Sequence, residues 1–517
     1  MQRRVLTARR IVGGDRVLMI GLDAADLLLI DRWSEEGRLP NLRRLMASGV
    51  SGRLQTSARY LVGSPWPTFF TGQPPTRHGI YHDFQWQHEG MRFARPAWDW
   101  LPVLPFWRRL EPEVQILSYD VPFLMGVQEA TGTEVVGFAS HDRIVEPVSH
   151  PPEALREVEA DFGSLRMLQE DYGVSDPEYL LDLLDFLLEV TRRSTRTSTR
   201  LLQRPWDLAV VVLGALHRGG HRLWDRSSAN RVMTVEEGEA FDRALMDLYI
   251  ECDKSVGEMI EAAGDATVIV FALHGMMVNA CRNDFLDAML ARVLSGTDAD
   301  PPRHSVVRRI GEALPLGLRR SVTQRIPARL RDRIMTSWAT GGADWSRTEA
   351  FSLRADLQGY LRINLSGRET EGIVPASEYD ALCKRLAAGL MSFRDADAGE
   401  PVVAEVRGPV EVYGPGEREA RVPDLVVRWV ESNAAPHVAL VSEEYGRVER
   451  ETPGRIPNGR SGNHRTEGFF VARGRGIPEG WRLSAVADIM DLAPTILQLL
   501  GVSCRDELAG TPIPIHG

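Results

Sequence analysis

Cysteine is scarce in this sequence, and long apolar runs are missing. The 517 residues include four cysteines without the spacing of a metal site or a disulfide framework: Cys252, Cys281, Cys383 and Cys504. No stretch approaches the roughly 18 apolar residues of a membrane span. The basic start MQRRVLTARRIVGGDRVLMIG lacks the apolar core of a signal peptide. We therefore expect a protein of the reducing cytoplasm with no membrane partner.

An excess of positive charge is also missing. The formal net charge is -10, so the chain offers no basic field to neutralise the phosphates of a nucleic-acid polymer. A hydrophobic content of 43% and a charged content of 26% are those of a globular protein with a sizeable core. The length suits two or three average domains, or one large α/β domain with insertions.

Apolar segments alternate with helical patterns along the chain. Strands are predicted at 16–22, 114–120, 207–215, 265–273 and 424–430, and helices at 24–37 and 40–49. The strands are nearly continuous in Val, Ile and Leu, which indicates burial on both faces. This pattern predicts an α/β fold in which helices cover both faces of a mostly parallel sheet.

Two regions depart from this alternation. Residues 151–203 and 285–345 show apolar residues at helical spacing, and both lie between predicted strands. We predict that they are helical insertions that cap one edge of the sheet. Their Met and Leu side chains are expected to pack rather than to bind a cofactor.

Polar residues follow the first strands at the place where an open α/β sheet binds its ligand. Asp23 ends the first strand, and Ser64 with Pro65 is typical of a helix start. A serine hydroxyl there lies in a positive field that binds anions and stabilises an alkoxide. Both side chains are equally compatible with simple helix caps.

Four histidines occupy similar places. His217 and His221 are four residues apart, a spacing that puts both imidazoles on one face of a helical turn, although Gly219 and Gly220 between them also allow a loop. His274 follows the strand at 265–273, and His464 lies in a glycine-rich loop. Each histidine alone is compatible with a backbone hydrogen bond. Together with Asp23 they favour a site for zinc, manganese or iron(II).

The order of these motifs resembles the alkaline phosphatase superfamily, and within it the type I phosphodiesterase/nucleotide pyrophosphatase branch. The matching segments are VLMIGLDAAD, PTFFTGQPPTRHGIYHDF, DLAVVVLGALHRGGHRLW, VIVFALHGM, YLRINLSGRE, PDLVVRW, GNHRTEGFFVARGRGI and DIMDLAPTILQLLG. They imply one catalytic domain over residues 16–510 with a three-layer αβα sandwich. The resemblance also implies two divalent cations, often zinc, and a Ser or Thr nucleophile.

The resemblance assigns metal ligands position by position, and two positions differ from the usual pattern. Asp23 matches a ligand of the second metal, while His221 and His464 match ligands of the first. His217 stands where most members carry an aspartate. Leu273 replaces the aspartate of the usual Asp-His-Gly motif, and His274 keeps its histidine.

These two changes remove two negative charges from the site. They imply one tight and one weak metal, with zinc as the first expectation and manganese or iron as alternatives. The tight site would be the three-histidine set with an open position, a common form for catalytic zinc.

The nucleophile position also departs from the family pattern. Members place it ten residues before the glycine of the Thr-Gly pair, which is Val62 here. Ser64 fits with a two-residue shortening and is the first candidate; Thr68 is the reserve. Arg218, Arg362 and Asn364 are candidate contacts to an anionic substrate, although packing explains the last two as well.

Three functions remain open at this point. The first is metal-dependent hydrolysis of a phosphate ester, a phosphodiester or a nucleotide-type pyrophosphate, through a serine nucleophile. The second is phosphoryl- or sulfuryl-group transfer at the altered metal site, and the third is a non-catalytic family member. In each case the expected partner is a small anionic ester, and the oligomeric state does not follow from the sequence.

Overall fold

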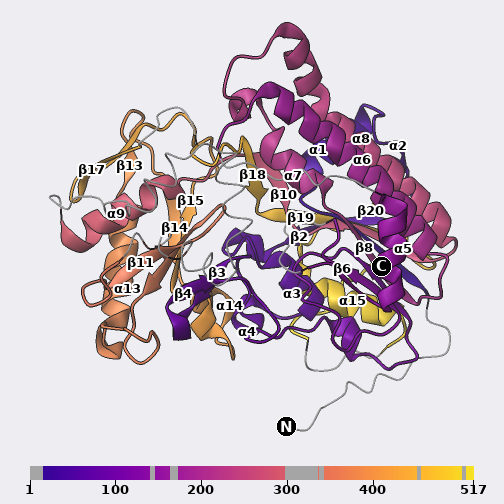
Figure 1. Cartoon of the computed structure of the whole chain (residues 1–517), viewed down its shortest axis with the longest axis horizontal. Helices are drawn as coiled ribbons and strands as arrows, with labels where there is room; N and C mark the ends of the chain where they lie inside the picture. Colours follow the sequence, from indigo (N-terminus) through magenta and orange to yellow (C-terminus); the bar gives the residue numbers. More distant parts are fainter. Residues whose placement is uncertain are drawn as a thin grey trace.

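The computed structural model describes residues 15–139, 146–163, 173–296, 336, 340, 343–450, 456–502 and 508–516. A large lobe surrounds a ten-stranded sheet, and a smaller lobe carries its own antiparallel sheet (Figure 1). The helices used below are α1 (Leu27–Glu35), α2 (Pro40–Ala47), α3 (Pro65–Thr71), α5 (Pro152–Phe162), α6 (Pro177–Leu201), α7 (Ala215–Arg222), α8 (Val235–Ala263), α9 (Asn283–Ser295), α13 (Ala376–Met391) and α15 (Leu492–Leu499).

The large sheet has the strand order β20-β2-β19-β9-β1-β8-β5-β6-β7, with β21 also paired to β2. Its strands are β1 (Val17–Leu22), β2 (Val50–Gln55), β5 (Ile116–Tyr119), β6 (Thr133–Val136), β7 (Val148–His150), β8 (Leu208–Leu213), β9 (Thr267–Ala272), β19 (Glu467–Arg473), β20 (Trp481–Arg482) and β21 (Ala487–Asp488). Strands β9, β1, β8, β5 and β6 are parallel to their neighbours in this series. The antiparallel strand β19 separates β9 from β2. Four of the five predicted strands lie in this sheet, and both predicted helices are confirmed, so the prediction of a mostly parallel sheet holds.

Side chains of β1 alternate between two cores, which is why its sequence is apolar throughout. Leu18 and Ile20 join the core beneath α1, α2, α6 and α8, whereas Val17 and Met19 join the core beneath α3 and α15. All six residues of β1 are buried. The sheet therefore carries helices on both faces, and the predicted three-layer αβα architecture is confirmed.

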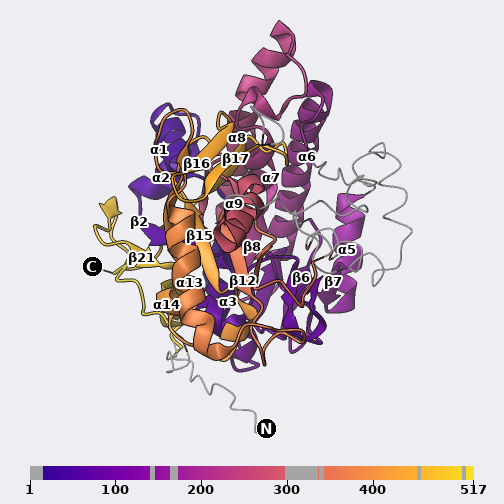
Figure 2. The same ribbon diagram turned by 90° about the vertical axis from the view of Figure 1, so that its left-hand side faces the viewer.

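The segment predicted as a strand at 424–430 is β15 (Leu425–Trp429), but it lies outside the parallel sheet. It belongs to an antiparallel sheet with β11 (Ala350–Leu353), β12 (Gly359–Ile363) and β14 (Val403–Arg407). Helices α9 and α13 pack against this sheet and give the smaller lobe its own core (Figure 2). Burial of β15 between that core and a second apolar cluster explains its nearly continuous apolar sequence.

Most of the described part of the segment 151–203 is helical, in α5 and α6. Helix α6 packs on α7 and α8 in the helical layer over the sheet, and α5 lies against the edge strand β7. Buried side chains of α6, among them Leu180, Leu183 and Leu187, join the same core as β1. The second predicted insertion begins with α9, but residues 297–335 of it lie outside the described residues.

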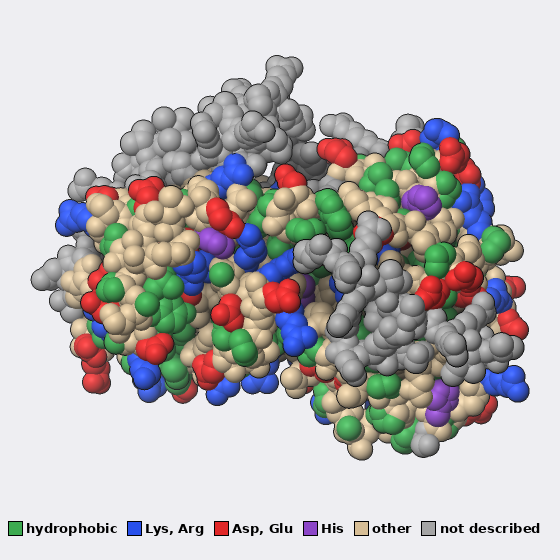
Figure 3. All heavy atoms as spheres, turned by 90° about the horizontal axis from the view of Figure 1, so that it is seen from below, with side chains coloured by type: hydrophobic (Ala, Val, Ile, Leu, Met, Phe, Trp, Pro, Cys, Tyr) green, Lys and Arg blue, Asp and Glu red, His purple; other side chains and the backbone are tan. Residues whose placement is uncertain are grey.

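On the face drawn in Figure 3, acidic and basic side chains of the described residues are interspersed rather than gathered by sign. No helix among the described residues is both long and apolar enough to span a lipid bilayer.

Candidate metal centre

Four elements bring polar side chains to the carboxyl end of the central strands. Asp23 follows β1, His217 and His221 lie on α7 directly after β8, and His274 follows β9. His464 comes from β18 (Gly462–Arg465), which pairs with β10 (Gly275–Val278) so that Met276 lies opposite His464. All five side chains are buried.

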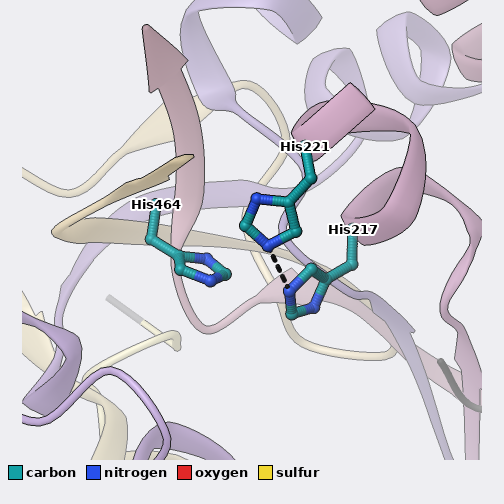
Figure 4. A group of neighbouring side chains, drawn as sticks. All are labelled: His217, His221 and His464. Carbon is teal, nitrogen blue, oxygen red and sulfur yellow. Dashed lines mark hydrogen bonds between the residues drawn. The ribbon is translucent and has the colours of Figure 1, made fainter. Parts of the chain in front are cut away.

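Three of these histidines form a compact group. One ligand atom from each of His217, His221 and His464 lies within 4.8 Å of the others. The Nε2 atoms of His217 and His221 are 3.0 Å apart. Figure 4 shows the three side chains converging from α7 and β18. His274 lies beside them, with its ring centroid 4.6 Å from that of His464.

Glycines allow α7 to approach its neighbours closely. A Cβ at Gly219 would lie 2.5 Å from a methyl carbon of Leu248 on α8, and one at Gly220 would lie 2.7 Å from Met276 Cγ. The loop alternative between the two histidines is therefore wrong, because tertiary packing outweighs the weak helix propensity of glycine. The helical turn puts both imidazoles on one face.

Asp23 joins two of the elements through hydrogen bonds. Its Oδ1 accepts a bond of 2.9 Å from the indole N–H of Trp66, and its Oδ2 lies 3.0 Å from Nδ1 of His217. Nε2 of His274 is 3.9 Å from Oδ1. The carboxylate thus holds α3 and α7 together at the end of β1.

Two of the buried histidines, His221 and His464, are kept neutral. Burial, with the nearby positive charge of Arg460, lowers the pKa of His221 well below its ordinary value. Burial and the neighbouring imidazoles lower the pKa of His464 in the same direction. Because a metal binds the neutral imidazole, these groups are in the ligating form over the physiological pH range.

The residues present fit one divalent cation. A tetrahedral zinc with Zn–N bonds of about 2.05 Å places its ligand nitrogens roughly 3.3 Å apart, close to the 3.0 Å between the two Nε2 atoms. Nδ1 of His464 is buried and has no hydrogen-bond partner among the described residues, and a cation would satisfy a nitrogen of this ring.

The predicted nucleophile lies in a separate chain of polar side chains. Ser64 Oγ is 2.6 Å from the carbonyl oxygen of Leu61 and 2.7 Å from Ser57 Oγ. Ser57 Oγ is 3.3 Å from Thr68 Oγ1, which is 3.0 Å from Nε2 of His78. Since the Leu61 carbonyl only accepts, the Ser64 proton points to it. Ser64 precedes α3, but its side chain makes no cap hydrogen bond.

His78 fixes the direction of this chain. Its Nδ1 accepts a hydrogen bond of 3.1 Å from the backbone N–H of Ile80, so Nε2 carries the proton that Thr68 accepts. Burial, assisted by the charge of Arg418, lowers the pKa of His78 to about 3. Protonation of Nδ1 would also break the bond from Ile80.

The depressed pKa of His78 predicts a loss of stability in mild acid. An unfolded histidine binds its proton near pH 6.5, whereas folded His78 does not, so its contribution is present above pH 6.5 and is lost as the pH falls towards 3. Between pH 7 and pH 5 the wild type should lose about 2 kcal/mol more unfolding free energy than His78→Gln. Urea unfolding at both pH values measures this. The exposed His516→Gln is the control, and equal losses in wild type and His78→Gln would contradict the assignment.

The three predicted substrate contacts lie in different surroundings. The Arg218 guanidinium lies 5.3 Å from the ring centre of Phe186. Arg362, in the smaller lobe, pairs with Glu369 at 2.7 Å and donates to the carbonyl oxygens of Val422 and Ala420. Asn364 donates its side-chain amide hydrogens to backbone carbonyls. The structure does not bring Arg362 or Asn364 together with the histidine group, and their contacts are those of a structural network.

Sequence analysis did not identify a second polar group next to the histidines. His82 pairs with Asp356 at 3.2 Å, and Asp356 pairs with Arg460 at 3.1 Å. Burial opposes the charge on His82, but Asp83 and Asp356 outweigh it and raise its pKa to about 9. The sequence signal for this group was proximity: His82 lies within the HGIYHDF segment, and Arg460 precedes His464 by four residues.

Comparison with known proteins supports one family. The model of the type I phosphodiesterase/nucleotide pyrophosphatase family matches residues 17–437. A search of the curated proteins gives no match. An inactive variant of murine ectonucleotide pyrophosphatase/phosphodiesterase 5 in complex with AMP is similar in structure, with 11% identity, 96% of this chain and 97% of that chain covered, and a TM-score of 0.47. A second structure of the murine protein gives 12% identity, coverages of 96% and 97%, and a TM-score of 0.46. The human protein of that name gives 12%, 95% and 96%, and 0.44.

Proposed function

The chain belongs to the type I phosphodiesterase/nucleotide pyrophosphatase family of the alkaline phosphatase superfamily, and from this premise we propose that it is a metal-dependent hydrolase of phosphate esters. The proposed substrate class is a phosphodiester or a nucleotide-type pyrophosphate. The observation that carries the proposal is the convergence of His217, His221 and His464, with their ligand atoms within 4.8 Å of one another.

The histidines would hold the cation, and the chain prepares them for it. His221 Nδ1 is 3.0 Å from the carbonyl oxygen of Gly462, and His217 Nδ1 is 3.0 Å from Asp23, so both rings present Nε2 to the centre of the group. When bound, a divalent cation there supplies charge stabilisation to the phosphoryl and leaving-group oxygens. Burial of the group excludes bulk water and strengthens this stabilisation.

Ser64 is the proposed nucleophile, with Thr68 in reserve. For attack, the Ser64 hydroxyl has to leave the Leu61 carbonyl, to which it donates at 2.6 Å. The hydroxyls of Ser57 and Thr68 and the ring of His78 can keep their hydrogen bonds to one another while the Ser64 side chain rotates. Arg218 is the proposed contact to the substrate anion, since it lies next to His217 on α7.

A second candidate function is a family member that binds a metal and does not turn over an ester. Two observations favour it: Leu273 is buried in the apolar core at the position of a usual ligand, and the Ser64 hydroxyl is engaged by a backbone carbonyl. Activity and metal content together separate the two candidates.

The test is an assay of chromogenic phosphate monoesters, diesters and nucleotide pyrophosphates with the purified full chain. We expect turnover of a diester or pyrophosphate that disappears after chelation and returns when zinc or manganese is added. Ser64→Ala should remove this turnover while metal content stays at the wild-type level. Turnover that survives chelation would contradict metal dependence, and turnover that survives in both Ser64→Ala and Thr68→Ala would contradict a hydroxyl nucleophile. Bound metal without turnover of any ester would support the second candidate.

A further inference from the structure

The Asp23 carboxylate is committed to hydrogen bonds on both of its oxygens. Oδ1 accepts from the Trp66 indole at 2.9 Å, and an indole N–H can only donate. Trp66 is 3% exposed and packs edge-on against Phe69 and Phe271, so its ring is fixed in this position. A cation on Oδ1 would have to share this oxygen with a donor that the core holds in place, and only one of its two lone pairs would remain for the cation.

The other oxygen of Asp23 contacts the Nδ1 side of the His217 ring, which is opposite to the Nε2 atom that faces His221. Oδ2 is 3.0 Å from Nδ1 of His217, while Nε2 of the same ring faces His221. This is the arrangement in which a carboxylate orients a ligating histidine from outside: it accepts the Nδ1–H bond and leaves the Nε2 lone pair for the metal. Asp23 therefore acts on the site through His217.

The contact between the two Nε2 atoms requires a positive charge. The Gly462 carbonyl can only accept, so Nδ1 of His221 carries a proton and its Nε2 is a lone pair. His217 likewise directs Nδ1 to Asp23. Two lone pairs at 3.0 Å repel each other unless a proton or a metal ion lies between them.

The surroundings of His274 do not fit a second cation. The neighbouring position 273, an aspartate in most of the family, is a leucine that is 1% exposed and packed in the same apolar cluster as Trp66 and Phe271. Nε2 of His274 lies 3.9 Å from Oδ1 of Asp23, the oxygen that already accepts the hydrogen bond from the Trp66 indole. A divalent cation there would share Oδ1 of Asp23 with the indole and would meet the methyl groups of Leu273 where the family supplies a second carboxylate.

We propose that the centre holds a single divalent cation on His217, His221 and His464, with Asp23 as the positioning carboxylate of His217 and with the family's second cation position replaced by Trp66 and Leu273. This inference rests on the proposed function in one respect: it assumes that the three-histidine group binds a cation. It replaces the expectation of one tightly bound and one weakly bound metal with a centre that binds one metal ion.

Metal titration of the apoprotein tests this directly. Zinc or cobalt(II), added to full-length protein after chelation, should bind at one equivalent, and cobalt(II) should show the strong visible absorption of a four-coordinate site. His464→Ala should abolish tight binding. Asp23→Asn should weaken binding by about 10- to 100-fold, the usual cost of losing an outer carboxylate, with the stoichiometry still one and the cobalt spectrum unchanged in type.

Asp253→Asn is the matched control, since Asp253 is also a buried aspartate but caps the start of α2. It should leave affinity and stoichiometry unchanged, and thermal unfolding shows whether each variant is folded. Two tight equivalents in the wild type, with Asp23→Asn reducing them to one at unaltered affinity, would overturn the proposal by making Asp23 a direct ligand. One equivalent without ester turnover would leave the inference standing and contradict the hydrolase function. Two equivalents with ester turnover would support the hydrolase function and contradict the inference of a single cation.

Discussion

His221→Ala is expected to lose the bound metal and to reduce metal-dependent ester turnover by about 10³-fold. The change removes one of the three proposed ligands and leaves His217 and His464, and two histidines are too few for a tight four-coordinate site. A metal ion contributes several kcal/mol of transition-state stabilisation, and about 4 kcal/mol corresponds to three orders of magnitude in rate. Metal content of the purified variant and its kcat/KM for the best ester measure both effects.

The exposed His516→Ala serves as the control for loss of an imidazole away from the site, and it should keep wild-type metal content and rate. His221→Ala should also remain folded, because α7 keeps its packing through Gly219 and Gly220 against α8 and β10. Turnover within tenfold of the wild type in a folded variant would show that this histidine group is not the catalytic centre.

The sequence was sufficient to predict which side chains meet at the end of the sheet. Asp23, His217, His221 and His274 each follow a parallel strand, and the topology of such sheets brings strand ends together. Their contacts to one another were not predictable, because they depend on a residue that no strand-end argument selects. Trp66 reads as a packing residue in the sequence, and only the structure shows its indole on Asp23.

Two other differences have a common cause. The glycines of α7 suggested a loop, and the apolar run at 424–430 suggested another strand of the central sheet. In both cases tertiary contacts decided the outcome: Gly219 and Gly220 leave room for Leu248 and Met276, and β15 is buried in the core of the smaller lobe. Local propensity and periodicity carry no information on such long-range neighbours.

Glu134→Ala is expected to cost about 3–5 kcal/mol of unfolding free energy, the usual cost of leaving a buried charge unpaired. Glu134 lies on β6 and is paired with Arg108 at 2.8 Å, with the two side chains 0% and 1% exposed. Its carboxylate also accepts hydrogen bonds from Trp107 and Ser118. Removing it leaves a buried guanidinium whose remaining hydrogen bonds, among the described residues, go to the backbone carbonyls of Gly126 and Gln128.

Urea unfolding of three variants separates the pair from simple loss of contacts. Glu153→Ala removes the partner of Arg156 in an exposed ion pair, in which the Glu153 side chain is 60% exposed and the Arg156 side chain 70%. This change should cost less than about 1 kcal/mol of unfolding free energy. The double variant Arg108→Met with Glu134→Leu should be more stable than Glu134→Ala, because apolar groups of similar volume leave no charge unpaired. If Glu134→Ala costs no more than Glu153→Ala, Arg108 must find solvent when its partner is removed, and this part of the core is less closed than its burial indicates.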